Sequence, residues 1–192
     1  MDQNHLVILV AGIVAVAVIA IVGFFLARKR RSAQLRERFG PEYDRVLKKE
    51  GEARRAEGVL QMRAQRREKF ELRPLTAAAR SDFSGRWRAV QSQFVDNPKA
   101  AVSGADQLVN ELMQARGYPV SDFDQRAADI SVDHPVVVEN YRAAHDIALR
   151  HSSGQASTED MRKAMVHYRD LFDELLDDSP ARELPARKEA RA

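Results

Sequence analysis

The chain begins with a long apolar run. Leu6 to Leu26 holds 21 residues without a charged side chain, and only Gly12 and Gly23 lie outside the hydrophobic residue types. As a helix this run would be about 31 Å long at roughly 1.5 Å per residue, which matches the roughly 30 Å hydrocarbon core of a bilayer. A helix also satisfies every backbone polar group internally. We therefore expect a transmembrane helix at residues 6–26, preceded by a short extracytoplasmic N-terminus at residues 1–5.

Two other interpretations of this run are less favourable. A cleaved signal peptide needs a basic start, a shorter apolar stretch and a cleavage site of small residues. Residues 1–5 contain no Lys or Arg, and the run ends with Phe24, Phe25 and Leu26 before a basic cluster. A buried core helix is seldom apolar on all sides over this length. A retained membrane span is the better interpretation.

The charges that flank the run predict its orientation. Only Asp2 precedes it, whereas Arg28, Lys29, Arg30 and Arg31 follow it directly. Lys and Arg are enriched on the cytoplasmic side of membrane spans. We therefore expect a single-pass protein of the cell membrane with its N-terminus outside and its C-terminal part in the cytoplasm. The same four basic side chains are candidates for contact with anionic lipid headgroups.

The remainder of the chain divides by charge, although the whole carries only +3. Residues 27–73 contain 16 Lys and Arg against 8 Asp and Glu, and residues 74–177 contain 11 against 16. A basic segment next to the membrane is thus followed by an acidic one. The chain has no cysteine, which excludes disulfides, thiolate metal sites, iron–sulfur clusters and cysteine nucleophiles.

Residues 27–73 are predicted to form a basic juxtamembrane helical arm. Apolar residues at helical spacing define one face of its first part: Leu35, Phe39, Tyr43 and Val46. Gly40-Pro41 interrupts that face, so we expect a break or kink there. From Glu52 to Leu72 the pattern is helical with few apolar residues, and Pro74 should end this helix.

Residues 74–177 are predicted to form a compact all-α cytoplasmic domain of four or five helices. Residues typical of helix N-termini occur at Thr76, at Asn97-Pro98, at Asp133 with Pro135 nearby, and at Ser157. A short helix is also possible after Asp122. No sustained alternation of apolar and polar residues predicts a strand. Residues 178–192 are polar and contain two prolines, so we expect a disordered tail.

Motifs that carry catalytic chemistry are missing from the sequence. It contains no glycine-rich phosphate loop, no nucleophile elbow and no His-Glu-x-x-His run. We expect no cofactor, and the sequence does not favour an enzyme. A metal site formed by His134, His145 and His167 from different predicted helices stays open as an alternative, beside the more ordinary interpretation of polar or capping histidines.

The segment Gln114–Asp133 is the best candidate for a recognition surface. It is rich in loops, and it places aromatic residues between prolines and aspartates. The candidate residues are Arg116, Tyr118, Phe123, Asp133 and His134. The alternative is a well-packed connection between helices, and the two interpretations are equally supported. The aspartates of this segment are expected to cap helices.

Nucleic-acid binding by the basic arm is not expected. Clustered Arg attracts phosphate without sequence preference, but no aromatic residue for base stacking lies between Val46 and Lys69. The aromatic residues Trp87 and Phe94 share a helical stripe and are predicted to belong to the core rather than to a ligand pocket.

Several strings resemble a group of small bacterial proteins with one N-terminal span and a cytoplasmic helical domain. They are RFGPEYDR at 38–45, WRAVQSQFVDNP at 87–98, RGYPV at 116–120 and YRAAH at 141–145. The resemblance covers most of residues 35–175 and implies a bacterial, membrane-tethered protein. The group brings no activity that can be carried over residue by residue.

Together these patterns predict a membrane-tethered, non-enzymatic interaction or scaffold protein. Its expected partners are the lipid bilayer and another protein. The alternative is a metal-binding helical bundle or an enzyme that uses histidines and carboxylates of residues 74–177.

Overall fold

The computed structural model describes residues 3–152 and 155–177, with side chains described at 16, 18–150 and 155–177. The predicted disordered tail, 178–192, lies outside the described residues. All regular structure in the described part is helical, as predicted, and it consists of eight helices without a strand. The chain divides into two compact units, Met1–Leu60 and Gln61–Ala192. Helix α3 (Ala53–Arg67) begins in the first unit and ends in the second.

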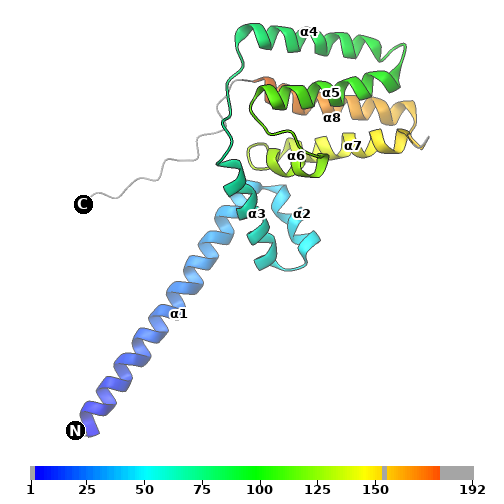
Figure 1. The fold of residues 1–192 in the computed structure, drawn as a ribbon. Helices are drawn as coiled ribbons and strands as arrows, with labels where there is room; N and C mark the ends of the chain where they lie inside the picture. Colours follow the sequence, from blue (N-terminus) through cyan, green and yellow to red (C-terminus); the bar gives the residue numbers. More distant parts are fainter. Residues whose placement is uncertain (1–2, 153–154, 178–192) are drawn as a thin grey trace. The chain divides into compact units, whose positions relative to one another are not determined.

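The first unit is built from α1 (Gln3–Phe39), α2 (Pro41–Glu50) and the first part of α3. The predicted break at Gly40-Pro41 is confirmed, because Gly40 has φ +47° and separates α1 from α2. Figure 1 shows α2 turning back from the end of α1 and α3 running in the opposite sense to α2. The predicted apolar face is buried, together with two residues of α3. Its members are Leu35, Phe39, Tyr43, Val46, Ala56 and Leu60.

Helix α1 is exposed along the part of the apolar run whose side chains are described. Large apolar side chains there are exposed on all sides of the helix: Val16, Val18, Ile19, Ile21, Val22, Phe24, Phe25 and Leu26. Within the described part of the chain, no helix combines the length and the apolar character needed to cross a membrane. The first ten side chains of the run Leu6–Leu26, residues 6–15, lie outside the described residues.

The second unit contains the five remaining helices. They are α4 (Ala77–Gln93), α5 (Pro98–Ala115), α6 (Phe123–Ile130), α7 (Val137–Ser152) and α8 (Thr158–Leu176). Helices α7 and α8 form a hairpin, α5 packs on α8, and α4 lies along α5 (Figure 1). The short helix α6 lies against α7.

Local sequence signals start most of these helices. Thr76 accepts a hydrogen bond from the Ala79 amide, Asn97 from that of Ala100, and Asp122 from that of Gln125. Ser157 forms a reciprocal capping box with Asp160. Each arrangement satisfies amide groups that the first helical turn leaves without a partner. These predicted starts are confirmed.

Two local expectations were wrong. Asp133 does not cap α7, which begins at Val137; its carboxylate accepts hydrogen bonds from Arg67 and Tyr118 instead. Helix α3 ends at Arg67 rather than continuing to Leu72. The chain then leaves the helix because Phe70 and Leu72 pack against the core of the second unit, and the Arg73 amide donates to the Arg116 carbonyl at 2.9 Å.

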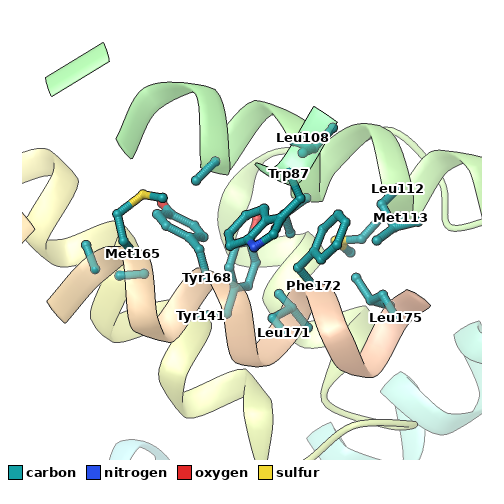
Figure 2. Packing of buried hydrophobic residues seen from close by; sticks show 14 of the residues in the cluster. Trp87, Leu108, Leu112, Met113, Tyr141, Met165, Tyr168, Leu171, Phe172 and Leu175 are labelled. Atoms are coloured by element: carbon teal, nitrogen blue, oxygen red, sulfur yellow. The ribbon is translucent and has the colours of Figure 1, made fainter. Parts of the chain in front are cut away.

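The core of the second unit is centred on Trp87 of α4. Its indole stacks on Phe172 of α8 with ring centroids 4.6 Å apart (Figure 2). Around this pair lie leucines and methionines of α5 and α8, among them Leu108, Leu112 and Leu175. The core role predicted for Trp87 is confirmed, and Phe94 packs partly buried against the same cluster.

Candidate functional site

The five residues of the candidate recognition surface do not share one environment. Arg116 and Tyr118 are buried, and Phe123, Asp133 and His134 are half-buried. Tyr118 is therefore part of a packed connection between helices, which was the alternative to a recognition surface. Two large apolar side chains, one within the segment and one just after it, are exposed, and neither is among the candidates predicted from the sequence. They are Val120, which is 77% exposed, and Val136, which is 71% exposed.

An arginine–aspartate cluster underlies this segment. Arg66 Nε donates to Asp129 Oδ1 at 2.9 Å, and Arg67 Nε donates to Asp133 Oδ2 at 2.5 Å. One turn earlier on α3, Arg63 donates to the Ser131 hydroxyl at 3.2 Å. The final turns of α3 are thus held against α6 and the residues that follow it.

Both carboxylates of the cluster are used by more than one donor. Asp129 is only 1% exposed, and its Oδ1 also accepts from Gln125 at 2.7 Å. Asp133 Oδ2 also accepts from the Tyr118 hydroxyl at 2.8 Å. A buried carboxylate must be paired and hydrogen-bonded to offset its desolvation. These two aspartates therefore hold the connection in place through contacts with distant residues. This role differs from the helix capping that was predicted for the aspartates of this segment.

The approach of the connecting chain depends on Gly117. Its φ of +95° is a left-handed conformation, and a Cβ atom built there would lie 2.3 Å from the Glu71 carbonyl oxygen. Glycine tolerates both conditions because it has no Cβ. The segment after α3 can therefore lie directly against the turn that follows α5, with Phe70 packed edge-on to Tyr118.

A second polar network joins four helices in the interior of the second unit. Arg126 of α6 donates to the Tyr141 hydroxyl at 3.2 Å, and this hydroxyl donates to Asn110 Oδ1 at 3.1 Å. The Asn110 amide then donates to Asp106 Oδ2, and the Tyr168 hydroxyl donates to Asp106 Oδ1 at 3.0 Å. From Arg126 to Asp106 each hydrogen bond is donated toward the anion, and Tyr168 donates to the same carboxylate from the opposite side.

Burial raises the pKa of the two phenols in this network. Burial raises the pKa of Tyr141 to about 12, although the nearby Arg126 lowers it. The pKa of Tyr168 is also raised, first by burial and then by the Asp106 carboxylate. Both hydroxyls therefore stay protonated to a higher pH than an exposed tyrosine would, and they act as donors in the network. Buried networks of this kind specify one arrangement of the helices when every member is satisfied.

The three candidate metal-binding histidines lie in different surroundings. His134 Nδ1 lies 3.0 Å from a carboxylate oxygen of Glu174. The His145 ring stacks on Phe123 with centroids 3.5 Å apart. His167 has a buried Nδ1 without a hydrogen-bond partner. Among the described residues, no three His, Cys, Asp or Glu side chains are grouped so that they could hold a metal ion.

The candidate lipid contacts lie where α1 leaves its apolar part. Arg28, Lys29, Arg30 and Arg31 are all exposed. They directly follow the exposed apolar residues of the same helix.

Comparison of the chain with protein-family models, with curated proteins and with solved structures found no match.

Proposed function

We propose that this protein is a single-pass protein of the bacterial cell membrane that presents a helical, non-catalytic interaction module to the cytoplasm. In this proposal residues 6–26 cross the bilayer, and residues 1–5 lie outside. The residues after the span form the basic and acidic cytoplasmic parts.

The observation that supports the anchor most strongly is the exposed apolar surface of α1. From Val16 to Leu26 the large apolar side chains described have no cover within the chain. Contiguous apolar surface of this kind is rare on soluble monomers and marks a surface that meets a membrane or a partner. The four basic residues that follow at once favour a bilayer and set the orientation.

The anchor and its orientation can be tested on the full chain in cells. We expect the protein to stay in the membrane fraction after alkaline carbonate extraction. With the C-terminus in the cytoplasm, a phosphatase that requires export should be inactive when it is fused there. A fluorescent protein fused at the same position in a second chain should be fluorescent. As a matched variant, replacing residues 28–31 by Gln should produce mixed orientation. An active C-terminal phosphatase on the unaltered chain would reverse the proposed topology.

The interaction module is supported by the segment around α6. The exposed valines at 120 and 136 flank this helix, while Asp129, Asp133 and Gly117 hold the surrounding chain rigidly. Exposed apolar side chains on a rigid support are suited to partner recognition, because little conformational entropy is lost on binding.

This part is tested with a photo-crosslinking residue placed singly at Val120, Val136 or Val95. Val95 is 84% exposed in the turn between α4 and α5, so it is a matched control outside the segment. We expect one recurrent protein adduct from positions 120 and 136 and none from position 95. Equal adducts from all three positions, or none from any, would refute a partner surface here.

A further inference from the structure

The first unit contains a second basic group besides Arg28–Arg31. Lys48 and Lys49 lie in the last turn of α2, and Arg54 and Arg55 lie in the first turn of α3, so all four flank the turn between the two helices. All four side chains are exposed. The acidic groups beside them are Glu50 and Glu52, and Glu52 pairs with Arg55 at 3.5 Å. The turn therefore keeps an excess of positive charge.

Contacts inside the first unit place this turn relative to α1. The Ser32 hydroxyl donates to Glu57 Oε1 at 2.5 Å, and the Tyr43 hydroxyl donates to the same oxygen at 3.1 Å. The Arg36 guanidinium lies over the Tyr43 ring, 4.8 Å from its centroid. Three helices therefore meet around the buried carboxylate of Glu57, at the level of Ser32.

The direction of the helices then places the basic residues on the same side as the apolar run. Helix α2 turns back from the end of α1, and α3 rises again (Figure 1). Arg54 lies one turn before Glu57, and Arg28 lies one turn before Ser32. Ser32 is six residues beyond Leu26, about 9 Å along the helix. The headgroup layer of a bilayer is about 5–8 Å thick on each side. Long basic side chains at this level can reach it.

We propose that the turn between α2 and α3 binds anionic phospholipid headgroups through Lys48, Lys49, Arg54 and Arg55, which together with Arg28–Arg31 form a basic collar. This inference rests on the membrane anchor proposed above. Two observations favour lipid over nucleic acid as the anionic partner. The collar is continuous with the exposed apolar part of α1, and no aromatic residue lies between Asp44 and Gly58 to stack on bases.

The collar gives the unit a second membrane contact with a defined consequence. An anchor alone leaves α2 and α3 free to tilt away from the bilayer. Binding at the turn would hold the three helices that meet at Glu57 close to the membrane surface. Each basic residue near an anionic surface contributes about 1 kcal/mol, so the ratio of headgroup-bound to free turn should fall by about fivefold for each one removed.

The absence of native cysteine permits a direct measurement on the full chain. Ala53→Cys introduces one exposed thiol in the turn, and a fluorophore is attached to it. The labelled protein is reconstituted into phosphatidylcholine vesicles with or without phosphatidylglycerol, both containing phosphatidylcholine with a spin-labelled headgroup as quencher. We expect strong quenching only with phosphatidylglycerol, and its loss in about 1 M salt, where the Debye length is about 3 Å.

Two charge variants complete the test. Replacing Lys48, Lys49, Arg54 and Arg55 by Gln should abolish the phosphatidylglycerol-dependent quenching. A control that replaces two Lys and two Arg of the second unit, Lys99, Lys163, Arg88 and Arg169, should retain it. Circular dichroism of both variants checks that the helices remain.

The outcomes separate this inference from the anchor on which it rests. Failure of the protein to float with vesicles of either composition would refute the anchor. If the protein floats but its quenching does not depend on phosphatidylglycerol, or if that dependence persists in the collar variant, the collar alone is overturned. Fluorescence that responds to added duplex DNA and not to phosphatidylglycerol would identify nucleic acid as the partner and overturn it equally.

Discussion

Gly117 is a single residue on which the packing of two distant segments depends. A side chain there meets both an unfavourable backbone conformation and the Glu71 carbonyl oxygen. We predict that Gly117→Ala lowers the free energy of unfolding by about 2–3 kcal/mol, because strained left-handed residues cost of this order and the neighbouring backbone must also move. Thermal denaturation followed by circular dichroism measures the change.

Gly85 supplies the control for this prediction. It lies within α4, and a Cβ atom there would meet nothing within 4 Å. Gly85→Ala should stabilise the protein by up to about 1 kcal/mol, since alanine is the better helix former. If both substitutions change stability in the same direction, the explanation from backbone strain is wrong.

His145 makes a pH-dependent contribution that can be isolated by substitution. Burial against Phe123 lowers its pKa below the ordinary value, although the carboxylates of Asp106, Asp124 and Asp146 oppose this effect and Arg126 adds to it. The unfolded chain, with a His pKa of about 6.5, then binds the proton more readily than the folded chain. The stability that neutral His145 contributes is fully present above that pH and is lost as the pH falls toward the folded pKa.

We therefore predict that the melting temperature of the wild type falls more steeply than that of His145→Phe between about pH 7 and pH 5. The phenylalanine ring retains the stack on Phe123 and cannot be protonated. Differential scanning calorimetry measures the melting temperatures of both proteins across this range. The difference between them cancels the contribution of groups that titrate in both. Parallel curves would show that His145 is not the group responsible.

At the scale of elements, carboxylates far along the chain hold the end of α3. Asp133→Ala would leave Arg67 without its carboxylate and the buried Tyr118 hydroxyl without an acceptor. We predict a loss of about 2–3 kcal/mol, because a buried donor without a partner bears its full desolvation cost. Chemical denaturation measures this loss.

A double-mutant cycle identifies the cause of that loss. Tyr118→Phe should be destabilising in the wild type and nearly neutral once Asp133 is removed, since both partners are then absent. Asp96→Ala, at an exposed position in the turn after α4, should change stability by less than about 0.5 kcal/mol. Additive effects of the Tyr118 and Asp133 substitutions would contradict the contact.

The elements that could be predicted are those governed by neighbours in sequence. Thr76, Asn97 and Ser157 begin helices because their side chains accept from amides three residues later. Asp133 carries the same local signal but does not cap, because two donors from elsewhere compete for its carboxylate. Propensity is a local preference that tertiary contacts override when they satisfy a buried charge.

On the scale of the whole molecule, the boundary of the second unit can be tested with fragments. The sequence pattern places a boundary before residue 74, whereas the compact unit begins at Gln61. Residues 61–73 contribute ion pairs and two partly buried apolar side chains, Phe70 and Leu72. We predict that fragment 61–177 is at least about 2 kcal/mol more stable than fragment 75–177, because apolar burial of this size is lost in the shorter one.

A third fragment, 69–177, separates the two contributions. It keeps Phe70 and Leu72 but lacks the arginines of α3, so its stability should lie between the other two. Urea denaturation followed by the fluorescence of Trp87, the single tryptophan, measures all three. Equal stability of the fragments would show that the contacts of residues 61–73 add nothing to this unit.

The helical class, the break at Gly40 and most helix starts were predictable from the amino-acid order alone, because they depend on side-chain periodicity and on hydrogen bonds that span three or four residues. The 21-residue apolar run and the basic residues after it, on which the proposed anchor depends, are likewise properties of the sequence. Three contacts followed only from how the helices pack: Arg66 meets Asp129, Gly117 lies against Glu71, and Ser32 meets Glu57 just after the turn between α2 and α3. These contacts join residues 20 or more positions apart, where the energy of pairing depends on how whole helices pack and not on local pattern.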